Sequence, residues 1–259
     1  MSKDKTINEI YYKDKVIVLT YHDIDPNGNM YSAYNISPKQ FANHLDKLLE
    51  NGFYIVNMDQ FIQFVLKDGT IPPNAVLLTF DDGNKSFYDY AFPELKKRSI
   101  PATNFVVVKL IDSSRCLSWD NMLEMKQFNL NFYSHTYNHH RNTNYGENKR
   151  LLTNFLFLEA ENRLESEAEY RNRIKKDLIL AQSILAGKLG EQPKLLCFPY
   201  GAYNETVVEV GKEIGIQLYF TVQKGINSRN QFLINRINAG DNRISANKLI
   251  EEIMNYCPK

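Results

Sequence analysis

Two adjacent carboxylates are the first residues in the chain whose type and spacing point to chemistry. Asp81 and Asp82 follow the apolar run Ala75–Phe80 and precede Gly83. Neighbouring side chains at a strand end point in different directions, so the two carboxylates do not readily share one task. One can bind a metal ion while the other handles a proton. Asp-Gly is also a common turn signal, so the pair alone is equally consistent with a simple turn.

A group of histidines is the second such feature. His135, His139 and His140 lie within six residues, directly after the apolar run 130–133, although the whole chain has only five histidines. Such a cluster at a strand end favours metal binding over a structural role. With one carboxylate it would form a His-His-Asp set that leaves coordination positions open for water or substrate, as a hydrolytic metal site requires.

Other conspicuous polar residues also come directly after apolar runs. They are His22 after residues 16–20, Tyr200 after 194–198, and Arg236 after 232–235. In a barrel of parallel strands, all such positions lie on the rim formed by the carboxyl ends of the strands, where active sites form. The convergence of these residues with the aspartates and histidines predicts an active site at that rim.

The elements that must position these residues alternate in type. We expect strands near residues 16–19, 53–56, 75–80, 103–108, 130–133, 194–198, 217–221 and 232–235. We expect helices over residues 58–67, 87–98, 119–127, 168–189, 205–214 and 246–256, and one that starts at Pro38 behind a Ser37 cap and is closed by Gly52. This alternation predicts an α/β fold with a parallel sheet covered by helices. Seven or eight such units in 259 residues favour a (β/α) barrel of seven or eight parallel strands over a doubly wound open sheet.

The chain shows no internal repeat and no linker, so we interpret residues 1–259 as one catalytic domain with an N-terminal extension over 1–14. Residues 141–167 are polar, rich in Asn and Glu, and long for a connection in a compact domain. This insertion is interpreted either as a surface excursion or as a loop that walls a substrate groove.

Charge and hydropathy exclude several classes of protein. The 31 basic and 30 acidic residues give a net charge of +1, which does not support nucleic acid as a partner. No run of 18 apolar residues is present, so we expect no transmembrane segment, and the polar stretch 1–10 does not have the pattern of a signal peptide. Nothing in the sequence predicts a protein partner.

Three motifs taken together resemble a known family. TFDDG at 79–83, SHTYNHH at 134–140 and FPYG at 198–201 are similar, in this order, to the motifs of polysaccharide deacetylases of the NodB-homology type. The resemblance spans roughly residues 22–236. It implies a distorted (β/α) barrel and a metal-dependent hydrolase that removes N-acetyl groups from amino-sugar polymers. LTYH at 19–22 precedes TFDDG, which resembles the circularly permuted subgroup that acts on poly-β-1,6-N-acetylglucosamine.

The resemblance also implies a metal site. Asp82 and His135 correspond to two metal ligands of the family, and the third ligand is either His139, by the general spacing, or His140, by the spacing in the permuted subgroup. We favour His140. Zn²⁺ is the expected ion for imidazole and carboxylate ligands, and Co²⁺, Ni²⁺ or Fe²⁺ also suit such a site.

The same resemblance implies catalytic roles. Asp81 corresponds to the catalytic base, His22 to the general acid, and the backbone N–H of Tyr200 to an oxyanion donor. The family carries an arginine shortly before the Pro-Tyr pair, and residues 195–198 of this chain contain none. We hypothesise that Arg236 supplies that cation from another strand; the alternative is a structural ion pair.

The expected substrate is therefore an N-acetylglucosamine polymer, either poly-β-1,6-N-acetylglucosamine or a peptidoglycan-like chain. Two other functions stay open: hydrolysis of a small amide by the same metal site, and carbohydrate binding by a domain that has lost activity. Polymers of this kind lie outside the cytoplasm, so we expect an extracellular or cell-surface location.

Overall fold

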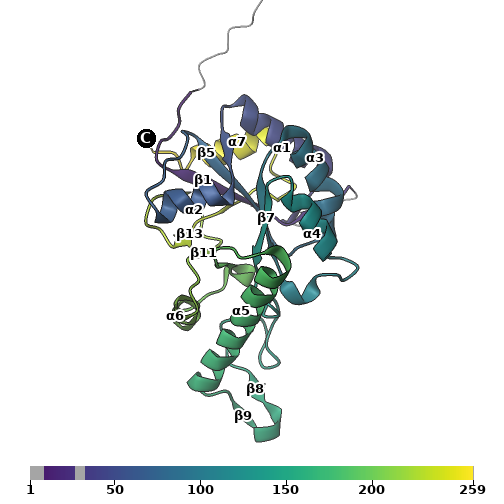
Figure 1. The fold of residues 1–259 in the computed structure, drawn as a ribbon, viewed down its shortest axis with the longest axis vertical. Helices are drawn as coiled ribbons and strands as arrows, with labels where there is room; N and C mark the ends of the chain where they lie inside the picture. Colours follow the sequence, from purple (N-terminus) through teal and green to yellow (C-terminus); the bar gives the residue numbers. More distant parts are fainter. Residues whose placement is uncertain (1–8, 27–32, 259) are drawn as a thin grey trace, which may run out of the picture.

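A twisted sheet of mostly parallel strands runs through the middle of the molecule (Figure 1). The structure is a computed structural model, and it describes residues 9–26 and 33–258. The strands of the main sheet are β1 (Val16–Tyr21), β4 (Tyr54–Val56), β5 (Ala75–Phe80), β6 (Ala102–Val106), β7 (Leu130–Ser134), β10 (Leu195–Cys197), β11 (Leu218–Phe220), β12 (Ile226–Asn227), β13 (Leu233–Ile234) and β14 (Ile237–Asn238). Their order is β12-β1-β5-β6-β7-β10-β11-β13, with β14 paired to β1 and β4 paired to β5.

The two edges of this sheet are joined by one short segment of chain. β13 pairs in parallel with β11, and β14 pairs in parallel with β1. Only Asn235 and Arg236 separate β13 from β14. The segment therefore passes from one edge of the sheet to the other and nearly closes it, which confirms the predicted (β/α) barrel.

The barrel is distorted along one hydrogen-bonding edge of β5. The β5 residues Ala75 to Leu77 pair with β4, whereas Thr79 and Phe80 pair with β6. Two strands thus share one edge of β5, β4 at its start and β6 at its end. A regular barrel would give each edge one partner.

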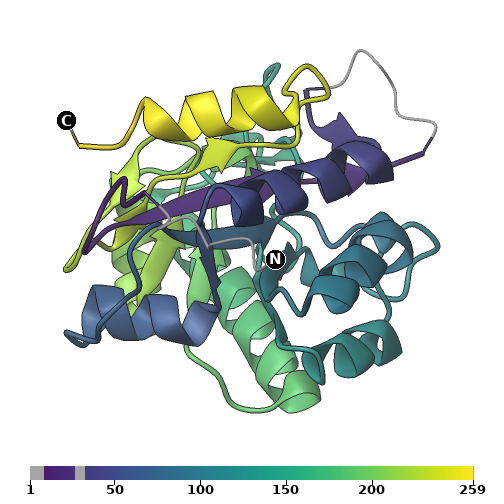
Figure 2. The same ribbon diagram turned by 90° about the horizontal axis from the view of Figure 1, so that it is seen from above.

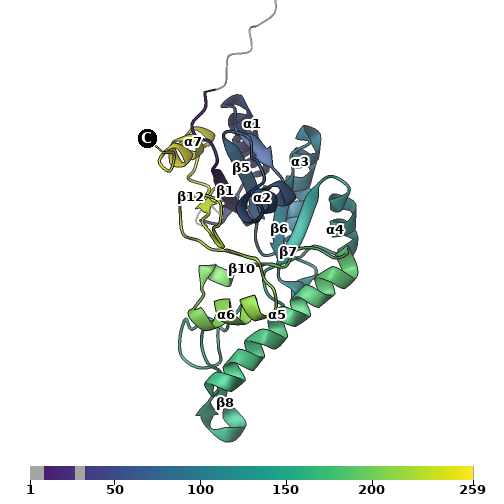
Figure 3. The same ribbon diagram turned by 60° about the vertical axis from the view of Figure 1, so that its left-hand side comes forward.

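Helices cover the outside of the barrel. They are α1 (Pro38–Glu50), α2 (Met58–Leu66), α3 (Phe92–Arg98), α4 (Trp119–Lys126), α5 (Glu167–Leu189), α6 (Glu205–Glu213) and α7 (Ala246–Met254). α1 and α7 pack side by side on one face (Figure 2), and α5 packs against α6 (Figure 3). α1 begins at Ser37, whose side chain accepts the Gln40 N–H, as the sequence predicted. No helix in the described part of the chain is long and apolar enough to cross a bilayer.

One expected helix is interrupted. Residues 87–98 form a π-helical turn, Phe87–Ala91, followed by α3. Pro93 lies in the first turn of α3 and has no N–H to donate to the preceding turn, so a regular α-helix cannot run through this point.

Alternation along the strands separates two apolar cores. Val16 and Val18 of β1 point into the barrel and pack with Leu77, whereas Ile17 and Leu19 pack in the layer beneath the helices. Because β-strand side chains alternate between faces, one strand supplies both cores. The next inward positions at the carboxyl ends of the strands are polar, and these positions build the site described below.

The insertion at residues 141–167 folds against the outer half of α5. It contains the hairpin of β8 (Phe157–Leu158) and β9 (Arg163–Leu164), joined by a 3₁₀ turn at Glu159–Glu161. The hairpin lies beside the end of α5 that is far from the barrel (Figures 1 and 3). A second small sheet, β2 (Asp23–Ile24) with β3 (Asn35–Ile36), follows β1. Residues 1–8 of the expected extension 1–14 lie outside the described residues, and the single-domain interpretation stays a prediction.

The interior core sets a first prediction. Leu77 is fully buried inside the barrel, and Leu123 on α4 is 46% exposed. Replacing Leu77 by Ala removes buried methyl groups and leaves a cavity, so the free energy of unfolding should fall by about 2–5 kcal/mol. Leu123→Ala, the matched control, should change it by less than about 1 kcal/mol. Urea denaturation measures both, and equal effects would contradict this assignment of the core.

Candidate active site

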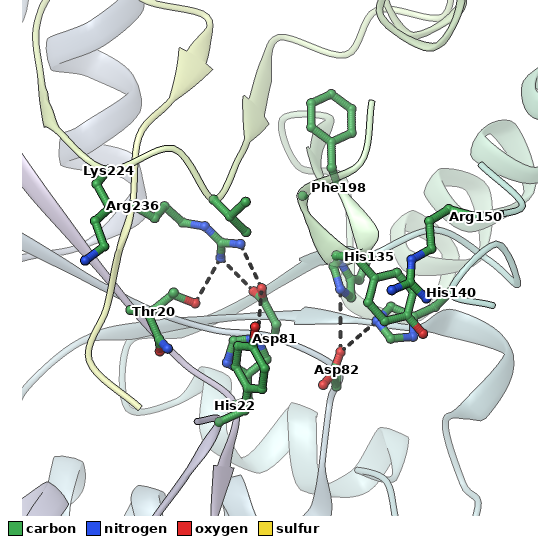
Figure 4. Close-up of a pocket in the computed structure, with 15 residues that line it drawn as sticks. Thr20, His22, Asp81, Asp82, His135, His140, Arg150, Phe198, Lys224 and Arg236 are labelled. Carbon is green, nitrogen blue, oxygen red and sulfur yellow. Dashed lines mark hydrogen bonds and ion pairs between the residues drawn. The ribbon is translucent and has the colours of Figure 1, made fainter. Parts of the chain in front are cut away.

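Most of the residues singled out in the sequence meet in one cavity of about 620 Å³ at the carboxyl ends of the barrel strands (Figure 4). The sequence-predicted residues that line it are His22, Asp81, Asp82, His135, His140, Tyr200 and Arg236. Other lining residues, which the sequence did not single out, include Thr20, Tyr34, Arg150, Lys224 and Asn238. His139 is the sequence-predicted residue that the structure places outside the cavity lining.

Asp82, His135 and His140 bring three possible metal ligands together. One ligand atom from each side chain lies within 4.8 Å of the other two. The Asp82 Oδ1 atom is 3.5 Å from His135 Nε2 and 3.2 Å from His140 Nε2. Burial acts to raise the pKa of Asp82, but the two neighbouring imidazoles outweigh it and hold that pKa well below its usual range. The carboxylate is therefore ionised at neutral pH.

The ring of His135 is oriented by the neighbouring strand. Its Nδ1 atom lies 2.9 Å from the carbonyl oxygen of Cys197, at the end of β10. A carbonyl only accepts, so Nδ1 carries a proton, and Nε2 is the ring nitrogen that faces Asp82. A backbone carbonyl on the far nitrogen is the usual support of a metal-binding histidine. The residues present thus fit a divalent cation held by two imidazoles and one carboxylate.

A second group of possible ligands, Asp81, His135 and Cys197, also lies close together. Both oxygens of Asp81 are already occupied, because each accepts a hydrogen bond from the Arg236 guanidinium at 2.8 Å. Burial raises the pKa of the Cys197 thiol, which keeps the sulfur protonated. The group containing Asp82 is therefore the better candidate metal site.

His139 turns away from the metal site and into the protein. Its side chain is 7% exposed, with Nδ1 3.6 Å from Asp177 Oδ1 and Nε2 3.4 Å from Arg173 Nη1. Burial and the Arg173 cation lower the pKa of His139 to about 3, so the ring is neutral. Of the two alternatives for the third ligand, the geometry places His140 beside Asp82.

Asp177 of α5 holds in place the loop of residues 135–140, which carries the three clustered histidines. Its two carboxylate oxygens accept the backbone N–H groups of Tyr137 and Asn138, each at 2.9 Å. Burial raises the pKa of Asp177 to about 6. Asp177 was not predicted from the sequence, although a carboxylate between Ile174 and Leu178 on the apolar stripe of the helix indicates a buried polar contact.

Asp81 and Arg236 form a bidentate ion pair at the bottom of the cavity. Asp81 is 3% exposed and Arg236 1% exposed. Arg236 also donates to the carbonyl oxygen of Thr221 at 2.8 Å and to the hydroxyl of Thr20 at 3.1 Å. Burial acts to raise the pKa of Asp81, but the guanidinium outweighs it and lowers that pKa to about 2. Asp81 is thus an ionised carboxylate in a desolvated place.

His22 stands on the other side of Asp81. Its Nε2 atom is 3.8 Å from Asp81 Oδ2, and its ring lies edge-on to Tyr34 with centroids 4.8 Å apart. Burial lowers the pKa of His22, and the neighbouring carboxylates only partly oppose this. A lowered pKa makes the imidazolium a stronger proton donor when it forms.

Tyr200 closes the side of the cavity next to His140. Its backbone is left-handed, with φ 58°, and Gly201 follows with φ 68°. A Cβ atom on Gly201 would lie 2.3 Å from Val222 Cγ2, so the turn needs glycine there. The Tyr200 ring stacks on the His140 ring, and the guanidinium of Arg150 lies over the Tyr200 ring. Arg150 belongs to the 141–167 insertion, so at least this part of the insertion reaches the cavity wall.

Comparison with known proteins matches the chain to one family and to several curated relatives. The family described as Polysaccharide deacetylase matches residues 68–219. The chain is 27% identical to the poly-beta-1,6-N-acetyl-D-glucosamine N-deacetylase of Escherichia coli K12 over 83% of this chain and 35% of that protein. It is 28% identical to the protein of the same name from Staphylococcus epidermidis, over 83% of this chain and 74% of that protein.

The fold is shared with a solved structure. A de-N-acetylase from Aggregatibacter actinomycetemcomitans superposes with a TM-score of 0.83 at 25% identity, and the match covers 92% of this chain and all of that one. The chain spans about a third of the length of the Escherichia coli relative. Since the family match includes more than half of the chain and carries the TFDDG, SHTYNHH and FPYG motifs, this chain belongs to the polysaccharide deacetylase family.

Proposed function

We propose that the protein is a metal-dependent hydrolase that removes N-acetyl groups from N-acetylglucosamine-containing polysaccharides. The observation that carries this proposal is the pairing of two groups in one cavity. A candidate ligand set, Asp82, His135 and His140, lies beside a buried and ionised carboxylate, Asp81. Hydrolysis of an acetamide needs an electrophile for the carbonyl and a base for the attacking water, and this arrangement offers a place for each.

In this proposal Asp82 Oδ1 and the Nε2 atoms of His135 and His140 hold the metal ion. When bound, the ion would polarise the acetyl carbonyl and acidify the attacking water. Zn²⁺ is the ion that we propose, because two imidazoles and one carboxylate with an open position are typical of catalytic zinc sites. Co²⁺, Ni²⁺ or Fe²⁺ would suit the same ligands.

Asp81 is the proposed general base, with Arg236 as its partner. The bidentate contact fixes the carboxylate and keeps it ionised, so it can accept the proton of the attacking water. This gives Arg236 the role of the arginine that residues 195–198 lack. Cys197 of β10 lies 3.1 Å from Arg236 Nη2 and is small enough to leave room for the guanidinium.

His22 and Tyr200 complete the proposed mechanism. His22, in its protonated form, would donate to the departing amine nitrogen, which would otherwise leave as an unstable anion. The backbone N–H of Tyr200 would donate to the oxygen that becomes negative during attack; a donor of this kind contributes about 3–4 kcal/mol to lowering the barrier. Proton transfer thus runs from water to Asp81 and from His22 to the product amine.

The proposed substrate is a polymer of N-acetylglucosamine such as poly-β-1,6-N-acetylglucosamine. Two relatives that match over 83% of this chain carry this polymer in their names. A polymer of this kind lies outside the cytoplasm, so we propose that the protein acts at the cell surface or beyond it.

The third metal ligand is tested by two adjacent substitutions. His140→Ala removes a ligand, so the Zn²⁺ affinity should fall by more than about 100-fold, beyond the loss typical of residues that only support ligands. His139→Gln, the neighbouring control, should keep the affinity within about tenfold of the original, because His139 faces Asp177 and Arg173. Competition with a chromophoric chelator measures both constants. The reverse order of effects would transfer the ligand role to His139.

The activity is tested by acetate release. The zinc-loaded protein should release acetate from β-1,6-linked N-acetylglucosamine oligomers and far more slowly from small acetamides. Asp81→Asn should retain Zn²⁺ but lose turnover by about 10²–10⁴-fold, the usual contribution of a general base. Preference for small amides would favour the small-amide hydrolase, and oligomer binding without acetate release would favour an inactive binding domain. Full turnover in Asp81→Asn would refute the base assignment.

The role of Arg236 is tested through pH dependence. In the native protein Arg236 lowers the pKa of Asp81 to about 2, so the base stays ionised into acid. Arg236→Met removes the cation, the pKa of buried Asp81 rises, and the acidic limb of the kcat/KM profile should move to higher pH. Loss of one partner of a buried pair also costs about 3–5 kcal/mol of stability, so Arg236→Lys is the milder companion variant. An unshifted profile with intact turnover would leave Arg236 as a structural ion pair only.

A further inference from the structure

We propose that Arg150, from the 141–167 insertion, is a positioning residue that holds the Tyr200 turn in its catalytic conformation; this inference rests on the function proposed above. The Tyr200 ring has two flat neighbours at the cavity wall, the Arg150 guanidinium and the His140 ring. The guanidinium carbon of Arg150 is 3.7 Å from the centre of the Tyr200 ring. The other neighbour of that ring is His140, with ring centroids 4.4 Å apart and planes inclined by 29°.

The Tyr200 turn needs such support because its backbone is energetically unfavourable. Tyr200 and Gly201 are both left-handed, with φ 58° and 68°, and the first of them carries a side chain. A non-glycine residue in this conformation persists only where its surroundings hold it. Tyr200 is 46% exposed, and its ring contacts His140 and Arg150. Release of the ring would let the backbone N–H leave the direction needed for an oxyanion.

Arg150 is itself fixed by the base of the insertion. Its Nη1 atom donates to the side chain of Asn142 at 2.9 Å, across an isolated bridge between the two residues. The next residues, Leu151 and Leu152, are buried, and the Tyr170 hydroxyl donates to the carbonyl oxygen of Leu152 at 2.8 Å. The guanidinium is therefore presented to the ring from an anchored backbone.

The stacking geometry favours support of Tyr200 over direct capture of substrate. The guanidinium of Arg150 lies over the Tyr200 ring, and a cation over an aromatic face is a stabilising contact. A group that only bound substrate would act on ground state and transition state alike, and its loss would raise KM without lowering kcat. Loss of a group that preorganises an oxyanion donor lowers kcat instead.

The test compares Arg150→Ala with Lys149→Ala. Lys149 is a matched control: it is the neighbouring cation, it lies over the Tyr145 ring at 5.2 Å, and it is not among the described residues that line the cavity. In the zinc-loaded protein acting on N-acetylglucosamine oligomers, Arg150→Ala should lower kcat by about 5- to 20-fold, less than the loss on removing an oxyanion donor outright. KM should change by less than about twofold. Arg150→Lys should lose less kcat than Arg150→Ala, because an ammonium also binds an aromatic face.

A second measurement reports on Tyr200 without relying on activity. In ¹⁵N-tyrosine-labelled protein, with the Tyr200 signal assigned by its absence from Tyr200→Phe, the Tyr200 amide should exchange with solvent faster in Arg150→Ala than in the native protein or in Lys149→Ala. Thermal unfolding confirms that each variant is folded.

The outcomes separate the two proposals. An unchanged kcat in Arg150→Ala, a rise in KM alone, or a fall in kcat without faster exchange at Tyr200 would each overturn the role of Arg150. Absence of acetate release by the native zinc-loaded protein would overturn the proposed function instead, and the exchange measurement would still decide whether Arg150 holds the turn.

Discussion

The buried ion pair between Asp81 and Arg236 is the interaction on which the site depends. Two charges removed from water are stable only with good geometry, and here both carboxylate oxygens meet the guanidinium at 2.8 Å. The same pair ties the end of β5, inside the sheet, to the segment between β13 and β14 that links the two edges of the sheet. The segment that closes the barrel therefore also carries the cation that keeps the proposed base ionised.

The different environments of two neighbouring aspartates follow from one turn of the backbone. Asp81 continues the inward alternation of Leu77 and Thr79, which directs its side chain into the barrel toward Arg236. Asp82 adopts φ 76°, and this left-handed step turns its carboxylate toward His135 and His140. One carboxylate thus faces a fixed cation and the other faces two imidazoles. The sequence analysis expected different tasks for the pair from side-chain direction alone, and the turn gives the physical reason.

Local sequence patterns predicted the strands and the rim of the barrel well, because side-chain alternation and the end of a strand each depend on a short stretch of sequence. The different environments of His139 and His140 could not be predicted in this way. They depend on Asp177, about 40 residues away in α5, which accepts two backbone N–H groups of the loop and lies beside the buried His139. The contribution of Arg150 was also hidden, since it requires the insertion to fold back on the cavity. The positions of these side chains depend on contacts between segments that are distant in the sequence, and hydrophobic periodicity does not report such contacts.

The insertion supplies a part of the site that lies outside the rigid barrel. The proposed ligands and base stand at strand ends, where the barrel fixes them, whereas Arg150 is supplied by a segment outside the repeating pattern. Leu151 and Leu152 anchor that segment against α5, while Tyr145 and Leu164 on its outer part are exposed. Changes in the outer part would therefore leave Arg150 and its stack on Tyr200 in place. Because loops tolerate change and a packed barrel does not, this arrangement lets the cavity wall vary without disturbing the charges at its centre.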